Sequence, residues 1–133
     1  MLKILLTALL MTTSFHLWAE DGAPAGPQIQ YIYFEPAFVV NYGSSGRIKY
    51  LRTDVALRVS STDAAAKVSH HRPFLRDRLV MLFSAQESVI LNTTQGREEL
   101  RQIALRELRA AMSQLESMPY IDDLFFNNFV VQN

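Results

Sequence analysis

The residue types best suited to metal binding or catalysis are few in this chain. His70 and His71 are adjacent. Adjacent side chains on a helix diverge by about 100°, so these two cannot share a metal ion without further ligands. The chain has no cysteine, which excludes disulfides, thiol catalysis and thiolate metal sites. We expect two solvated histidines near a helix end, and neither a metal nor another cofactor. A small hydrolase using His70 or His71 is the less favoured alternative.

Other reactive side chains stand in patterns that structural roles explain. The run Gly43-Ser44-Ser45-Gly46 superficially suggests a phosphate loop. It lacks the lysine and the helix that follow such a loop, so it predicts a hairpin turn. Glu98 and Glu99 suit the positive end of a helix dipole, and Asp122 and Asp123 suit a turn that opens a strand. No nucleophile elbow places a serine, so we expect no catalytic residues.

A short basic run is the strongest candidate for a binding surface. Arg72, Arg76 and Arg78 surround Asp77 within a predicted helix. Arginine is suited to bidentate pairing with a carboxylate on a partner. The alternative is a solvated helix face on which Asp77 neutralises its neighbours. We take these four residues as the candidate interaction surface.

The last forty or so residues predict the element on which the domain is built. Thr93 or Thr94 is a suitable N-cap for a long helix, and Met118-Pro119 ends it because a proline disfavours helical backbone in the residue before it. The aromatic-rich stretch from Ile121 to Val131 then predicts a strand that is buried on much of both faces. One helical stripe is apolar, at spacings of three and four: Leu100, Ile103, Ala104, Leu108, Ala111 and Leu115.

The upstream residues predict the sheet against which this helix and strand pack. Residues 31–41 form a strand that Pro36 splits, so the strand either lies at an edge or carries a bulge. Residues 50–59 alternate apolar and polar side chains, as in an antiparallel hairpin with the first strand. The order predicts an α+β fold, a small mixed or antiparallel sheet with helices packed on one face. The remaining predicted elements are a helix over Ala64–His71 capped by Asp63, a helix over Phe74–Phe83, and a short edge strand over Val89–Leu91.

The N-terminal residues predict export. Residues 1–19 resemble a signal peptide, with Lys3 before an apolar run and Ala19 at the cut; an uncleaved short membrane anchor is the alternative. Residues 20–30, with Gly22, Pro24, Gly26 and Pro27, form a flexible linker. Residues 31–133 then form one domain. The formal net charge is zero, so we expect no nucleic-acid partner.

An ordered set of short motifs resembles the periplasmic domain of the FliL family, which is associated with the flagellar basal body. Each motif alone is weak, but together they keep the family's order across nearly the whole domain. The motifs are residues 36–41, Tyr50-Leu51, Pro73 with Arg76-Asp77, residues 94–98 with Leu100-Arg101, and residues 126–132.

The resemblance implies a fold similar to the stomatin and prohibitin scaffold domain. It implies a non-enzymatic role without a cofactor, in which the domain self-associates and contacts the stator of the flagellar motor to support motility. The expected location is the periplasm, at the inner membrane and the basal body. Typical members keep a true transmembrane helix, whereas residues 1–19 are short and polar-interrupted, which is consistent with a secreted paralogue. A general periplasmic stomatin-like scaffold without a link to flagella is the alternative function.

Overall fold

The computed structural model describes residues 28–44 and 46–133 of the chain. The predicted signal peptide or anchor (1–19), and the linker up to residue 27, lie outside the described residues. Within the described part, no helix combines the length and the apolar composition that a bilayer crossing requires. The elements, in chain order, are β1 (Gln30–Tyr33), β2 (Phe38–Tyr42), β3 (Lys49–Val59), α1 (Thr62–His70), α2 (Arg72–Ser84), α3 (Ser88–Leu91), α4 (Thr94–Glu116) and β4 (Ile121–Gln132).

The sheet is built around β3, the strand with the clearest alternation in the sequence. β1 and β2 pair with the two halves of one side of β3, so that Ile32 lies opposite Leu57 and Val40 opposite Leu51. β4 pairs along the other side of β3, and every pairing is antiparallel. The predicted hairpin is therefore confirmed. The predicted interruption at Pro36 is confirmed too, because the first strand is divided into β1 and β2 on either side of it.

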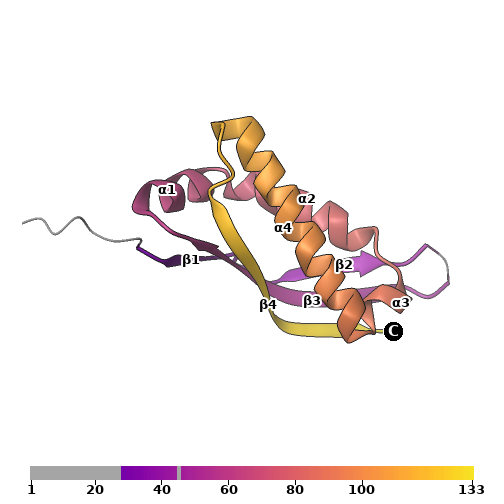
Figure 1. Cartoon of the computed structure of the whole chain (residues 1–133). Helices are drawn as coiled ribbons and strands as arrows, with labels where there is room; N and C mark the ends of the chain where they lie inside the picture. Colours follow the sequence, from indigo (N-terminus) through magenta and orange to yellow (C-terminus); the bar gives the residue numbers. More distant parts are fainter. Residues whose placement is uncertain (1–27, 45) are drawn as a thin grey trace, which may run out of the picture.

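The helices pack on one face of this sheet (Figure 1). Alternate residues of β3, including Leu51, Val55 and Leu57, point into one core cluster with buried side chains of the helices. The intervening β3 residues Arg52 and Tyr50 are exposed on the opposite face. The α+β prediction with an antiparallel sheet and helices on one face is thus confirmed, whereas the stomatin-like relationship stays a prediction.

The long helix begins and ends as its sequence predicts, but its buried stripe is different at the end. The Thr93 side chain accepts a hydrogen bond of 3.0 Å from the Gly96 N–H, and Ser117 ends the helix with a left-handed φ of 67°. Leu115, predicted on the buried stripe, is 42% exposed, whereas Met112 is fully buried. Helical rotation places residue 115 on the same side as residues 108 and 111, so its exposure comes from its position in the last turn of α4 and not from the helix face.

Two local predictions were wrong. Ser61, not Asp63, caps α1, since its hydroxyl accepts a 3.0 Å bond from the Ala64 N–H while Asp63 lies in the first turn, 3.4 Å from Lys67. Residues 89–91, predicted as an edge strand, lie in the short helix α3. Hydrogen bonds within α3, including Leu91 N–H to the Glu87 carbonyl, replace the strand pairing that so short an apolar run would need.

β4 is an edge strand and is not buried on both faces as predicted. Ile121 and Leu124 are buried, whereas Val130 is 55% exposed. Phe125 and Phe126 are both half-buried. Because helices cover only one face of the sheet, the alternate side chains of β4 face away from the core whatever their hydrophobicity. The aromatic composition that suggested full burial reflects a partly exposed aromatic surface instead.

Candidate functional site

The structure divides the predicted arginine surface into one structural residue and three exposed ones. Arg76 on α2 donates to the Pro36 carbonyl at 2.8 Å and to the Ala37 carbonyl at 3.2 Å. Its guanidinium carbon lies 4.3 Å from the centre of the Phe38 ring. Arg76 therefore connects α2 to the segment that joins β1 and β2, and its donors are largely used within the domain.

Arg72, Asp77 and Arg78 remain on the surface of α2. All three are exposed, and no ion pair within the described residues involves them. Arg72 makes a long 3.4 Å contact with the Ser69 hydroxyl, and the Arg78 guanidinium lies 5.3 Å from the Phe74 ring centre. Arg78 also borders a hollow with Met81, which is 64% exposed. The exposed guanidinium groups retain donors that a partner could use.

The two histidines serve different purposes. Their rings meet edge to face, 4.9 Å apart. His70 is exposed, whereas His71 is half-buried with its Nε2 at 2.8 Å from Glu116 Oε1. His71 is thus less solvated than predicted, and it connects the α1–α2 junction to the end of α4. Within the described residues no group of three potential metal ligands comes together.

The acidic pairs are engaged in side-chain networks. Glu98 lies 2.6 Å from Arg101, and Arg101 also lies 2.7 Å from Asp123 on β4. Asp122 accepts a hydrogen bond from the Ser60 hydroxyl. The sequence predicted only a helix-dipole role for Glu98 and a turn role for Asp122 and Asp123. The structure adds contacts of these carboxylates with Arg101 and Ser60.

The electrostatics of the Arg101 network follow from its hydrogen bonds. Bonds from Arg101, and then from Gln102, lower the pKa of Glu98 from 4.5 to about 2. The same Glu98 bond raises the pKa of Arg101, and Asp123 adds to that shift. Both groups are therefore charged at neutral pH, and an acid with so low a pKa does not suit proton donation near pH 7.

The described residues of the glycine–serine run, 43–44 and 46, connect β2 to β3, as predicted. Gly43 and Gly46 both have left-handed backbone, with φ of 88° and 89°. β3 follows the turn directly in the chain, whereas a phosphate loop leads into a helix. This geometry fits the hairpin interpretation and offers no phosphate cradle.

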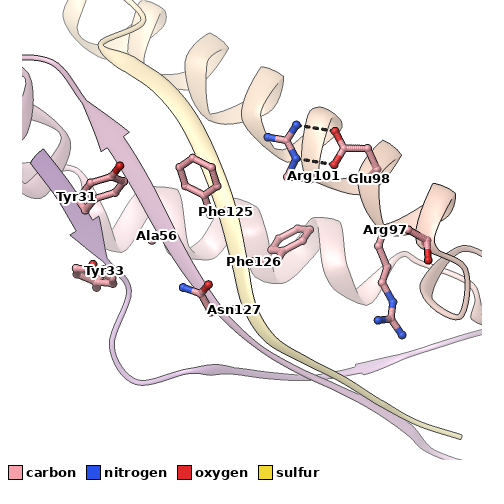
Figure 2. Close-up of a pocket in the computed structure, with 10 residues that line it drawn as sticks. Tyr31, Tyr33, Ala56, Arg97, Glu98, Arg101, Phe125, Phe126 and Asn127 are labelled. Atoms are coloured by element: carbon pink, nitrogen blue, oxygen red, sulfur yellow. Dashed lines mark hydrogen bonds and ion pairs between the residues drawn. The ribbon is translucent and has the colours of Figure 1, made fainter. Parts of the chain in front are cut away.

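A groove between α4 and β4 is the concave feature that sequence reasoning missed (Figure 2). Its volume is about 570 Å³. Thr94, Arg97 and Arg101 line it from α4, and Phe125 and Phe126 line it from β4. The Arg97 guanidinium lies 4.8 Å from the Phe129 ring centre, and its Nε donates to the Leu91 carbonyl at 2.7 Å. Charged and aromatic groups thus meet at one edge of the sheet.

The groove continues onto the sheet face that the helices leave open. Tyr31 and Tyr33 of β1 line it there, and both are about half exposed, at 49% and 56%. Tyr33 and Phe125 lie on either side of Ala56 across the sheet, and the Tyr31 and Phe125 ring centres are 6.3 Å apart. The Ala56 side chain is small and lies between Tyr33 and Phe125, so it leaves a depression in the surface between the two rings (Figure 2).

The sequence did contain a partial signal for this groove. The Tyr-Ile-Tyr alternation at residues 31–33 places both tyrosines on one face, and the pair Phe125-Phe126 must point to opposite faces of β4. What it lacked was the position of α4 beside the β4 edge, which brings Arg97 and Arg101 to these rings.

Comparison with known proteins adds the family context. The family model described as flagellar basal body-associated protein FliL matches residues 31–132. The flagellar protein FliL of Aquifex aeolicus is 27% identical over 109 residues, which cover 81% of this chain and 65% of that relative. The flagellar protein FliL of Escherichia coli K12, like that of Shigella flexneri, is 30% identical over 81 residues, covering 61% of this chain and 49% of the relative. The chain thus spans between about half and two thirds of the curated relatives it matches.

Proposed function

Because the chain belongs to the FliL family of flagellar basal body-associated proteins, we propose that it is an accessory subunit of the flagellar motor that contacts the stator. The family is non-enzymatic, so the chain acts by association. The family match carries this proposal. In it, residues 1–19 direct the domain to the periplasm, either as a cleaved leader or as an anchor in the inner membrane, and the domain supports motility there.

The exposed part of the α2 surface is the proposed contact with the motor. Arg72 and Arg78 present guanidinium groups with no acidic partner among the described residues. Asp77 between them adds a charge of opposite sign, which favours one orientation of a partner with complementary charges. Arg76 contributes by holding α2 against the β1–β2 connection rather than by reaching a partner.

The proposal also includes self-association. The open sheet face supports it, because Val39, Tyr50 and Val130 are exposed there around a shallow hollow. Contiguous apolar surface of this kind marks contact sites on soluble domains. Sedimentation of the purified protein over a range of concentrations would detect association, and a single monomeric species at all concentrations would contradict it.

Deletion of the gene tests the proposed motor role. We expect reduced swarming on viscous agar, and we expect a pull-down with the wild-type protein to recover the stator. Normal motility together with no recovered stator protein would refute the role.

Charge reversal on α2, compared with charge reversal at a control position on α4, tests whether α2 is the contact surface. The double variant Arg72→Glu/Arg78→Glu should lose stator recovery and fail to restore swarming while its melting temperature is unchanged. The control is Arg106→Glu on α4, which also reverses an exposed arginine and should behave as wild type. If the double variant restores swarming fully, α2 is not the contact surface.

A further inference from the structure

The outer edge of β4 exposes backbone groups whose direction can be worked out from the pairing. Within an antiparallel pair, successive residues direct their N–H and C=O groups alternately toward and away from the partner strand. The Val55 carbonyl accepts a 3.0 Å bond from Phe34 on the β1 side, so Val55 does not bond to β4. Its opposite residue, Phe126, must therefore direct its N–H and C=O away from β3, toward the free edge.

Side chains already occupy the neighbouring outward groups. Arg101 donates to the Leu124 carbonyl at 3.1 Å, and Asp123 accepts from the Leu124 N–H at 2.8 Å. Arg109 donates to the Ile121 carbonyl. No side chain in the described residues makes such a bond to the Phe126 backbone, and α4 provides arginines on one side of it. The β4 edge is protected over its first half and open at Phe126.

The groove described above lies against this open position. Its α4 wall contains Arg97, which has no carboxylate within ion-pair distance in the described residues, and Arg101, which is already paired with Glu98 and Asp123. Its other wall is the aromatic surface of Tyr31, Tyr33 and Phe125 on the open sheet face. Glu98 also lines the α4 wall, so the two arginines leave an excess of one positive charge there, and the space beside Phe126 has a positively charged side and an apolar side.

We propose that this groove binds an extended acidic segment of another protein, which adds as a strand beside β4. Its backbone bonds to the Phe126 N–H and C=O, as in strand addition to other exposed sheet edges. Side chains of an extended segment alternate between faces, so an acidic residue would reach Arg97 while the apolar residues beside it lie over Phe125. The sequence recognised is thus an alternation of apolar and acidic residues.

The charges favour a single strand of a partner over a second copy of this chain. Two copies paired through their β4 edges would each bring Arg97 to the same edge, and Arg97 has no acidic partner among the described residues, whereas Arg101 is neutralised by Glu98 and Asp123. Like charges brought together at an interface oppose association. The proposal goes beyond the stator contact proposed for α2 and does not depend on it, because α2 does not line this groove.

Peptide binding followed by amide hydrogen exchange tests the proposal. The probe is a blocked hexapeptide of alternating valine and aspartate, titrated into the full-length protein. In the free protein the Phe126 N–H should exchange faster than those of Phe125 and Asn127, which point to β3. The peptide should slow exchange at Phe126 by at least about tenfold at saturation, and the same peptide with N-methylated backbone should not bind.

Two further arms separate charge from backbone pairing. Arg97→Gln should weaken the valine–aspartate peptide by about tenfold, the scale of one charge-assisted hydrogen bond, and leave a valine–serine peptide unaffected. Arg106→Gln, an exposed α4 control, should change neither. No binding at millimolar peptide, or protection at residues away from β4, would overturn the proposal. Phe126 protection that appears without peptide and grows with protein concentration would also overturn it, since a second copy would then be the occupant.

Discussion

Replacing Arg76 with alanine should destabilise the protein far more than replacing either of its exposed neighbours on the same helix. Arg76 donates to two carbonyls, of Pro36 and Ala37, and lies on the Phe38 ring. The sequence separation between α2 and Pro36 is 40 residues, so these contacts close a long loop of the fold. The alanine variant loses all of them together.

The expected magnitude can be worked out from the contacts. Each hydrogen bond contributes about 1 kcal/mol, which is below the roughly 1.5–3 kcal/mol of a charged donor because the Pro36 bond is solvent-exposed. The cation–π contact with Phe38 adds about 0.5 kcal/mol. The sum is about 2.5 kcal/mol, which corresponds to a melting-temperature decrease of about 10–20 °C for a domain of this size.

Thermal and urea unfolding followed by circular dichroism provide the assay. Arg72→Ala and Arg78→Ala are the matched controls and should change stability by less than about 0.5 kcal/mol, as surface substitutions usually do. Arg76→Lys should give an intermediate loss, because lysine keeps the charge but lacks the fork that reaches two carbonyls. If Arg76→Ala unfolds at the same temperature as Arg72→Ala, Arg76 does not stabilise the fold more than its exposed neighbours. Its separation from Arg72, Asp77 and Arg78 would then be wrong.

Three further predictions test the core, the cap and the Arg101 network. Leu108→Ala should lower the free energy of unfolding in urea by about 2–5 kcal/mol because Leu108 is fully buried. Leu115→Ala on the same helix should lower it much less, because Leu115 is 42% exposed. Equal losses would contradict the difference in burial between these two leucines. Gly96→Ala should destabilise, although alanine normally favours a helix, because a Cβ there would overlap the Ile90 carbonyl and lie 2.7 Å from Thr93 Oγ1; a raised melting temperature would contradict this packing. The Glu98 carboxyl should titrate near pH 2 by NMR. Since its folded pKa lies below its unfolded value of 4.5, its stabilising contribution is present above about pH 4.5 and is lost as the pH falls toward 2. Arg101→Gln should return the titration midpoint of Glu98 toward 4.5, and a wild-type midpoint already near 4.5 would refute the Arg101 contact.

Sequence reasoning succeeded where one segment contained its own signal. The alternation of residues 50–59 specified a half-buried strand, and Thr93 and Pro119 marked the limits of α4. It failed where two candidates were locally equivalent. Ser61 and Asp63 both suit an N-cap, and only the hydrogen bond to Ala64 distinguishes them. The apolar residues 89–91 were too short for their periodicity to separate strand from helix.

The candidate site was less predictable because its contacts join distant segments. The sequence identified the basic run on α2 but gave no reason to set Arg76 apart, since its partners are carbonyl groups whose direction depends on the β1–β2 connection. The groove depends on α4 lying beside the β4 edge, which no local pattern specifies. Composition even misled here, because the aromatic residues of β4 suggested burial on both faces.

The most direct test of the proposed motor association is photo-crosslinking in living cells. A photoreactive amino acid in place of Arg78 on α2 should give a covalent adduct with a stator subunit. The same amino acid in place of Arg106 on α4 should give none. Adducts of equal yield at both positions, or adducts at Arg78 that contain no flagellar protein, would contradict the proposal that this domain acts by contact with the stator through α2.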